Sequence, residues 1–405
     1  MNTIDEVHEV NATRGQTRSI GNRLANRALR AHAADAPQAE SASEPVSLKP
    51  VSQAALASAK RAYTTRRCDF ADVHFLMTDG VKPEAGDLVL ARVEEIGQHS
   101  GLHAVTGRRS TLFAGDEIIV AYGNRYAPDQ FEAVVPDDLG PCQLAAGGGV
   151  AARVTHSHAK MRRATQLKPL GLLADADGRV VNLRRYALPL AERPVERPVT
   201  IAVVGTSMNS GKTTTAAHLV RGLRAAGLVV SAAKVTGTGA GGDPWLMRDA
   251  GATDVLDFTD AGYVSTYKLP IDELCGCIDR ILDHLGSRGA QVAVIEIADG
   301  LFQKETAALL SMPRATEYFD LLMFAAQDAM GAAAGVDWLE QRGLNVAAVT
   351  GLVTASPLAA REAARAVSLP ILKLADLSNG RSAGRLYELA RQAADAVAEA
   401  AERAA

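Results

Sequence analysis

The stretch Gly205-Thr-Ser-Met-Asn-Ser-Gly-Lys-Thr-Thr214 constrains the fold more than any other part of this sequence. An apolar run, TIAVVG at 200–205, precedes it, and a run with helical spacing, TTTAAHLVRGLRAAG at 213–227, follows it. Glycines let a loop turn its backbone N–H groups inward, and the N-terminus of a following helix attracts anions. A strand, a glycine-containing loop and a helix in this order predict a phosphate-binding loop.

The residue types within this loop suggest individual roles. Lys212 would place a positive charge on the β and γ phosphates of a nucleotide, and Thr213 would offer its hydroxyl to Mg²⁺. Five residues, rather than the common four, separate Gly205 from Gly211. The full set expected to contact the nucleotide within the loop is Gly205, Asn209, Ser210, Gly211, Lys212, Thr213 and Thr214. Because no Asn/Thr-Lys-x-Asp guanine motif follows, we expect ATP rather than GTP.

Strand-like and helix-like runs alternate from residue 200 to the end of the chain. After the first helix, strand-like runs are expected at 228–235, 291–300, 321–328, 345–354 and 369–376. Helical runs include 271–286 and a long segment that starts near residue 384. This alternation predicts the α/β class, with a mostly parallel, doubly wound sheet in a P-loop domain over 198–405.

Charged residues lie at, or shortly after, the ends of two of these strands, 228–235 and 291–300. In an open α/β sheet, ligands gather at the carboxyl ends of the strands. Lys234 is therefore expected to act as a second cation over the phosphates, the alternative being a surface lysine with a buried stem. Asp243 and Glu296, together with Thr213, are the expected Mg²⁺ ligands. Asp299 is the alternative to Glu296, because successive residues of a strand point to opposite faces.

Residues after the later strands receive weaker predictions. Gln327 and Asp328 are expected near a second substrate, and Thr354 near the nucleotide base. Ser356 precedes Pro357, which is typical of an N-cap followed by proline at the first helical position.

The N-terminal half differs from the rest of the chain in composition and in its pattern of apolar residues. Residues 1–60 are rich in Ala, Ser, Arg and Glu, and predict a disordered or partly helical arm, with a short helix near 18–30. Over 65–190, β-rich runs at 86–97, 115–124, 149–158 and 178–188 predict a small β-barrel-like domain. The proline-containing segment 188–199 is interpreted as a linker.

A basic stretch, 153–163, contains His156 and His158 two residues apart. On a strand these side chains share a face, which suits a metal or an anion. A solvated sheet edge explains the same pattern. The β-rich domain as a whole is interpreted as a recognition module or a lid over the nucleotide site.

Composition limits the number of domains, the kinds of partner and the state of the cysteines. The chain has 405 residues, which favours two domains, and 43 basic against 46 acidic residues give a net charge of −3. Nothing in this balance favours a nucleic-acid or membrane partner. The four cysteines match neither a disulfide framework nor a zinc pattern, so we expect reduced thiols in a cytoplasmic protein.

Residues 198–380 resemble the dethiobiotin synthetase and cobyric acid synthase group of P-loop proteins, which belongs to the MinD-related class. GTSMNSGKT looks like the group's G-T-x5-GK-[ST] loop, the strand ending at Lys234 looks like its Lys-Pro-Val segment, and Glu296-Ile-Ala-Asp-Gly300 looks like its Glu-Gly-Ala-Gly-Gly segment. Asp243 falls near the group's metal aspartate. Val235 replaces a proline, Asn209 an acidic residue, and Thr354 an asparagine that reads the base.

The resemblance implies Mg-ATP binding, a homodimer, and activation of a small carboxylate or carbamate by phosphoryl transfer, as in an ATP-dependent ligase or synthetase. The alternative is a nucleotide-switched regulatory or assembly ATPase whose β-rich domain binds a partner. The loop lacks the upstream lysine of MinD-like switches, which favours the enzyme. A third hypothesis, a degenerate nucleotide binder, disagrees with the intact Lys212, Thr213 and Glu296.

Overall fold

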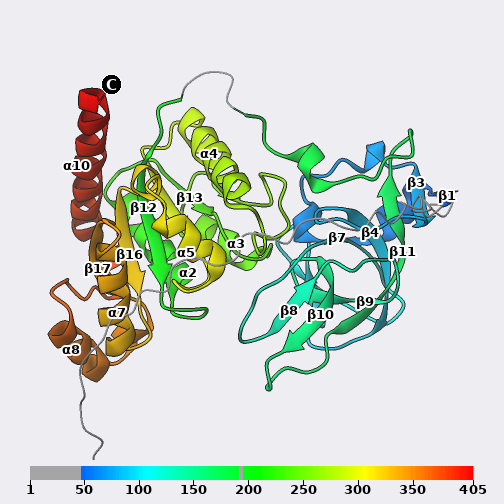
Figure 1. The fold of residues 1–405 in the computed structure, drawn as a ribbon, viewed down its shortest axis with the longest axis horizontal. Coiled ribbons are helices and arrows are strands. Elements are labelled where there is room, and N and C mark those ends of the chain that lie inside the picture. The colour runs from blue at the N-terminus through cyan, green and yellow to red at the C-terminus, as the bar shows by residue number, and fades with distance from the viewer. Residues whose placement is uncertain (1–46, 191–194, 405) are drawn as a thin grey trace, which may run out of the picture. The chain divides into compact units, whose positions relative to one another are not determined.

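A six-stranded parallel sheet organises the second half of the chain (Figure 1). The computed structural model describes residues 47–190 and 195–404. Every paired strand of this sheet is parallel, and the order is β14-β13-β15-β12-β16-β17. The strands are β12 (Val199–Gly205), β13 (Val230–Lys234), β14 (Val255–Asp257), β15 (Val292–Glu296), β16 (Leu321–Ala325) and β17 (Val346–Thr350).

Helices cover both faces of this sheet, because alternate strand residues feed two separate cores. Ile201 and Val203 of β12 pack with α2 and α10, whereas Ala202 and Val204 pack with α4 and α7. The helices of this half are α2 (Lys212–Ala225), α3 (Gly242–Asp249), α4 (Ile271–Ser287), α5 (Lys304–Ser311), α6 (Ala315–Tyr318), α7 (Ala329–Glu340), α8 (Pro357–Ala366), α9 (Leu374–Ser378) and α10 (Gly380–Ala404). The predicted α/β class with a parallel sheet is confirmed.

Two details of the sheet were predicted wrongly. The run 369–376 is not a strand: Ile371 forms an isolated bridge with Val349, and α9 begins at Leu374. The short edge strand β14 was missed, since its three residues carry no alternating pattern. The predicted cap at Ser356 is present, because its hydroxyl accepts a hydrogen bond from the Ala359 amide and Pro357 opens α8.

The first half of the described chain is rich in β-strands. Its main sheet has nine strands with the path β1-β3-β11-β4-β7-β10-β8, and β2 pairs with β7. Because β9 pairs with both β10 and β11, the pairs β11-β4-β7-β10-β9 close into a ring. The strands are β1 (Ser47–Pro50), β2 (Lys60–Arg61), β3 (Phe75–Asp79), β4 (Leu88–Glu95), β5 (Gly101–His103), β6 (Arg109–Thr111), β7 (Glu117–Tyr122), β8 (Phe131–Val134), β9 (Cys142–Ala146), β10 (Val150–Ser157) and β11 (Thr165–Ala174).

Three of the four predicted β-rich runs hold β4, β7 and β10, but the run 178–188 does not hold a strand. It makes bridges at Val180 and Asn182 and then a 3₁₀ turn at Leu183–Tyr186. The predicted arm and its helix at 18–30 lie mostly outside the described residues, while 47–61 already contain β1, α1 (Gln53–Ser58) and β2. The predicted boundaries of a separate barrel-like domain stay predictions.

The described residues from Ser47 onward belong to one compact unit, and polar contacts join its β-rich part to the six-stranded sheet. The Tyr63 hydroxyl donates to Asp257 Oδ2 at 2.8 Å, and Arg66 forms ion pairs with Asp257 and Asp260. Both carboxylates are buried, so this cluster ties the 3₁₀ turn after β2 to the edge strand β14. Within the described residues, no helix has the length and apolar character needed to cross a membrane.

Candidate functional site

The loop between β12 and α2 has a backbone suited to an anion. Gly211 has φ of 99° and Asn209 has φ of 60°, a conformation that turns N–H groups into a concave surface. A Cβ on Gly205 would lie 2.4 Å from the Ser210 hydroxyl, so the tight turn at the end of β12 requires glycine. Helix α2 begins at Lys212, and its N-terminus faces the loop.

Lys212 is 5% exposed, and its ammonium donates to the Ser207 carbonyl at 2.7 Å. Burial lowers its pKa, although Glu296 and Asp299 partly oppose this effect. The ammonium lies at a cavity of about 350 Å³ beside the loop. Of the residues predicted to contact a nucleotide, those that line this cavity are Asn209, Gly211, Lys212, Thr213 and Thr214.

Strand register brings the predicted charged residues together. In the parallel pair β13–β15, Lys234 lies opposite Glu296, and both residues end their strands. The Lys234 ammonium is 3.6 Å from Glu296 Oε1 and forms a closer ion pair with Asp243 of α3. The Thr213 hydroxyl donates to Glu296 Oε1 at 3.1 Å. A lysine, two carboxylates and a hydroxyl from four elements therefore meet at the loop.

Burial and charge shift these groups in different directions. Burial raises the pKa of Glu296, and Lys234 only partly offsets it. Burial alone would raise the pKa of Asp243, but the Lys234 charge holds it below its usual value. Burial lowers the pKa of Lys234, but the negative charges of Asp243 and Glu296 raise it by more than burial lowers it. The pKa therefore lies above its usual value, and the ammonium stays protonated.

The oxygen atoms beside the loop fit Mg²⁺. Glu296 Oε2 is buried without a hydrogen-bond partner among the described residues, and the Thr213 hydroxyl lies against Oε1. Mg²⁺ is commonly held by one or two carboxylates together with phosphate and water oxygens. The described residues contain no group of three or more His, Cys, Asp or Glu side chains placed to hold a metal by themselves. Thr213 and Glu296 are therefore residues that could hold Mg²⁺ together with the phosphates of a nucleotide.

Other predicted residues occupy different places. Thr354 donates its hydroxyl to the Gly351 carbonyl at 2.8 Å, and its neighbour Leu352, not Thr354, lines the cavity. Asn209, which lines the first cavity, also donates a side-chain hydrogen bond to Asp129 of the β-rich region. Ser210 is buried behind the loop.

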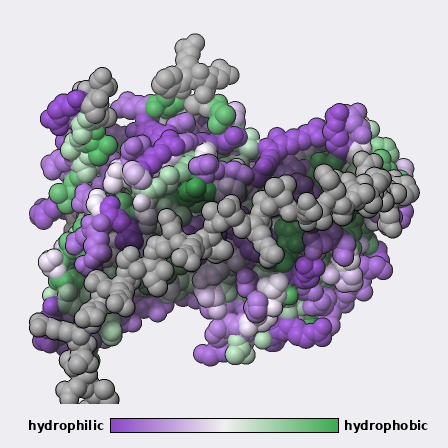
Figure 2. Space-filling model, in the orientation of Figure 1, coloured by the Kyte–Doolittle hydropathy of each residue, from purple (hydrophilic) through white to green (hydrophobic). Residues whose placement is uncertain are grey.

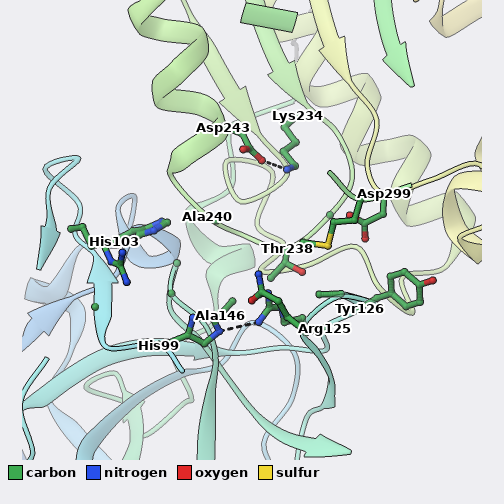
Figure 3. Close-up of a pocket in the computed structure, with 18 residues that line it drawn as sticks. His99, His103, Arg125, Tyr126, Ala146, Lys234, Thr238, Ala240, Asp243 and Asp299 are labelled. Carbon is green, nitrogen blue, oxygen red and sulfur yellow. Dashed lines mark hydrogen bonds and ion pairs between the residues drawn. The ribbon is translucent and has the colours of Figure 1, made fainter. Parts of the chain in front are cut away.

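A second cavity, of about 330 Å³, adjoins the first (Figure 3). Four residues line both cavities: Met208, Lys234, Asp243 and Asp299. The opposite wall comes from the β-rich region. Its polar members are His99, His103, Arg109, Arg125, Tyr126 and Gln130. Burial raises the pKa of the Asp299 carboxyl, which lies where the two cavities meet.

Sequence reasoning missed this opposite wall. Its residues are spread over several strands and loops of the β-rich region, with no spacing that a motif search would detect. The histidines that the sequence did suggest, His156 and His158, lie at a different cavity of about 270 Å³. His156 is exposed and contacts Glu132 at 2.8 Å, as expected for a solvated sheet edge.

The chain thus has a P-loop nucleotide-binding fold. No protein-family model and no curated protein matches it. A similar solved structure is the signal recognition particle 54 kDa protein of Aeropyrum pernix K1 in complex with GDP: 20% identity, TM-score 0.33, covering 50% of this chain and 50% of that chain.

Two structures of the signal recognition particle receptor FtsY of Elizabethkingia anophelis are also similar. One, in complex with GDP, has 20% identity and a TM-score of 0.28, covering 40% of this chain and 52% of that chain. The other has 19% identity and a TM-score of 0.33, covering 51% of this chain and 74% of that chain. In the first two structures, the match spans about half of the solved chain. Such scores carry no argument about function, which has to come from the site.

Proposed function

We propose that this protein is an Mg-ATP-dependent ligase or synthetase that transfers the γ-phosphoryl group to a small carboxylate or carbamate. The observation that carries the proposal is the pair of adjoining cavities, which share Lys234, Asp243 and Asp299. One lies at the phosphate loop, and the other is open to solvent and lined by polar side chains from the β-rich region and from the P-loop half. Such a pocket favours an enzyme with a small second substrate over a switch that needs a broad contact surface.

The visible surface agrees with this preference. Figure 2 shows a face on which hydrophilic residues predominate, with hydrophobic residues in small separate areas between the grey atoms. A regulatory ATPase that docks a protein partner would favour a broad apolar patch. The ATP preference, the homodimer, the cytoplasmic location and the closer relation to dethiobiotin synthetase remain parts of the proposal.

The loop residues would position and neutralise the transferred group. Lys212 and the backbone N–H groups around Gly211 would hold the β and γ phosphates, and Lys234 would neutralise the moving phosphoryl from the side of the second cavity. Thr213, Glu296 and Asp243 would hold Mg²⁺, which would help to neutralise the negative charge of the phosphates. The Lys212–Ser207 contact would give way to the phosphates.

The phosphoryl transfer itself needs no proton from the protein. A carboxylate oxygen of the acceptor attacks the γ phosphorus, the new O–P bond forms, and the bond from that phosphorus to the β–γ bridging oxygen breaks, which releases ADP. An amine then attacks the acyl carbon, and inorganic phosphate leaves. The amine loses a proton in that second step, and Asp299, at the junction of the cavities, is placed to accept it.

The experiment is Mg-dependent ATP turnover by the full chain, with and without a panel of small carboxylic acids and amines. Wild type is compared with Lys212→Ala and with Arg179→Gln, a control on an exposed arginine. We expect turnover that one class of acid stimulates, that Lys212→Ala abolishes and that Arg179→Gln leaves unchanged. Turnover that no acid in the panel changes would contradict the synthetase function. Turnover of GTP but not of ATP would show that the protein uses GTP.

A further inference from the structure

Arg125 is a buried arginine without an acidic partner. It is 5% exposed, and its contacts are to neutral groups: the Ala145 carbonyl, the His99 ring at 3.1 Å and the Gln130 side-chain oxygen at 2.8 Å. Among the described residues, no carboxylate oxygen lies within 4.0 Å of its guanidinium. Arginines are almost never this buried unless an anion pairs with them.

The guanidinium also has unused donors. Its five N–H groups form a planar fork, and the three contacts above engage Nη1 twice and Nη2 once. Nε is buried with no hydrogen-bond partner among the described residues, and one N–H of Nη2 is also free of a protein contact. Nε and Nη2 together are the edge that grips two oxygens of a carboxylate.

The residues around Arg125 do not cancel its positive charge at its end of the second cavity. Burial lowers the pKa of His99 to about 4, and burial also lowers the pKa of His103, so both rings are neutral near pH 7. Arg109 lines the same wall and has no carboxylate within 4.0 Å among the described residues. The acids whose charges act on Arg125 are Asp299 and Asp129.

Neither acid neutralises Arg125 by direct contact. Asp129 Oδ2 accepts a hydrogen bond from Asn209 of the phosphate loop, and Asp299 lies at the junction of the cavities. Figure 3 shows Arg125 and His99 on one side of the cavity, and Lys234 with Asp243 on the opposite side. A molecule between them would meet Arg125 at one end and, at the other, Lys234 with its ion-pair partner Asp243.

We propose that the second cavity binds a small acceptor with two carboxylates, one held by the Nε–Nη2 edge of Arg125 and the other presented to Lys234 and the phosphate loop. The inference rests on the proposed function for the reacting carboxylate, but the anchoring by Arg125 does not need turnover. The volume of about 330 Å³ suits a short dicarboxylic acid and excludes a polymer. The N–H groups of Nε and Nη2 that lack a protein partner would match the two oxygens of one carboxylate.

Binding without nucleotide tests the anchor by itself. Isothermal calorimetry of the full-length wild type would compare malonate, succinate, glutarate and adipate with the corresponding monoamides. We expect at least one diacid to bind at least about 30-fold more tightly than its monoamide, because the monoamide lacks one carboxylate and leaves a buried charge of the protein unpaired. Equal binding of every acid and its monoamide, or no diacid binding at millimolar concentration, would overturn the proposal.

Variants locate the contact. Arg125→Gln and Arg125→Lys should each weaken the preferred diacid about 30-fold or more, because neither keeps the two-donor edge. Arg179→Gln is the exposed control and should bind as wild type does. Circular dichroism establishes whether each variant is folded. If a variant does not fold, the comparison of diacid with monoamide binding by wild type still tests the proposal. Unchanged diacid binding by folded Arg125→Gln would overturn the proposal.

Turnover separates the two hypotheses. Arg125-dependent diacid binding without stimulated ATP turnover would support the anchor and contradict the synthetase function. Turnover stimulated equally by monocarboxylic and dicarboxylic acids would support the synthetase function and overturn the anchor.

Discussion

The Thr213 hydroxyl donates to Glu296 Oε1 at 3.1 Å, across the gap between the start of α2 and the end of β15. The other oxygen, Oε2, is buried and has no hydrogen-bond partner among the described residues. Such an atom in a site lined by Lys212 and Lys234 is best explained by a cation that arrives with the nucleotide.

Glu296→Gln keeps the side-chain shape but removes the charge. We expect Mg-dependent ATP turnover to fall by roughly 10–100-fold or more, since metal sites lose about this much when a supporting carboxylate is lost. ATP binding in EDTA should change little. Turnover and Mg²⁺ titrations would measure both, with Glu317→Gln, an exposed residue of α6, as the control. Unchanged turnover would move the metal role to Asp299.

Gly211→Ala and Gly227→Ala separate backbone strain from loss of the phosphate site. Both glycines have positive φ, 99° and 89°, so alanine costs each about 1–2 kcal/mol in the left-handed region. A Cβ at Gly211 would also lie 3.1 Å from Gly351 Cα, whereas Gly227 has nothing within 4 Å. Urea unfolding should show similar losses in both, but only Gly211→Ala should weaken ATP binding, by about tenfold or more. Equal ATP binding by both variants would contradict the role of the loop.

How far the sequence predicts this molecule depends on how local each feature is. The phosphate loop is a local feature, because its strand, loop and helix all lie within residues 199–225. The flanking strand and helix can therefore be recognised from the same short stretch of sequence as the loop. Lys234 and Glu296 could be placed together because parallel strands end at one edge of a sheet, and the register Lys234↔Glu296 follows that rule.

Features that depend on distant parts of the chain escaped prediction. The run 369–376 is apolar enough for a strand, but only Ile371 reaches β17, and Asp376 accepts a hydrogen bond from the Lys373 amide at the start of α9. Arg125 reads as an ordinary surface arginine in the sequence. Its side chain contacts His99, Gln130 and Ala145, which come from separate parts of the β-rich region, and no local pattern encodes that arrangement.

Arg66 lies at the contact between the two sheets, and Arg66→Met should destabilise the fold. The change leaves the buried Asp257 without its cation and the buried Asp260 with Arg67 alone, at 3.7 Å, and breaking a buried pair typically costs about 3–5 kcal/mol. Equilibrium urea unfolding would measure the loss. Arg92→Met, which removes a partly exposed pair with Glu117, is the matched control and should cost about 0–1 kcal/mol. A loss for Arg66→Met as small as that of the control would contradict the structural role of the cluster.

His99 should make the fold less stable in acid. Burial, with the charge of Arg125 second, lowers the pKa of the folded ring to about 4, below the value of roughly 6.5 for an unfolded histidine. Between these values the unfolded chain binds more protons, so the contribution of His99 is complete above about pH 6.5 and is lost as the pH falls toward 4. The shift corresponds to at most about 3 kcal/mol.

Urea unfolding from pH 7 to pH 4 tests this directly by comparing wild type with His99→Gln. His99 Nε2 faces both the Ala145 carbonyl and Arg125; a glutamine amide can donate to the carbonyl through its nitrogen or accept from Arg125 through its oxygen, but it does not titrate. The free energy of unfolding of wild type should therefore fall more steeply toward pH 4 than that of the variant. His74→Gln, on an exposed residue, should follow wild type. Parallel pH profiles for wild type and His99→Gln would show that the ring takes up a proton as easily in the folded chain as in the unfolded one.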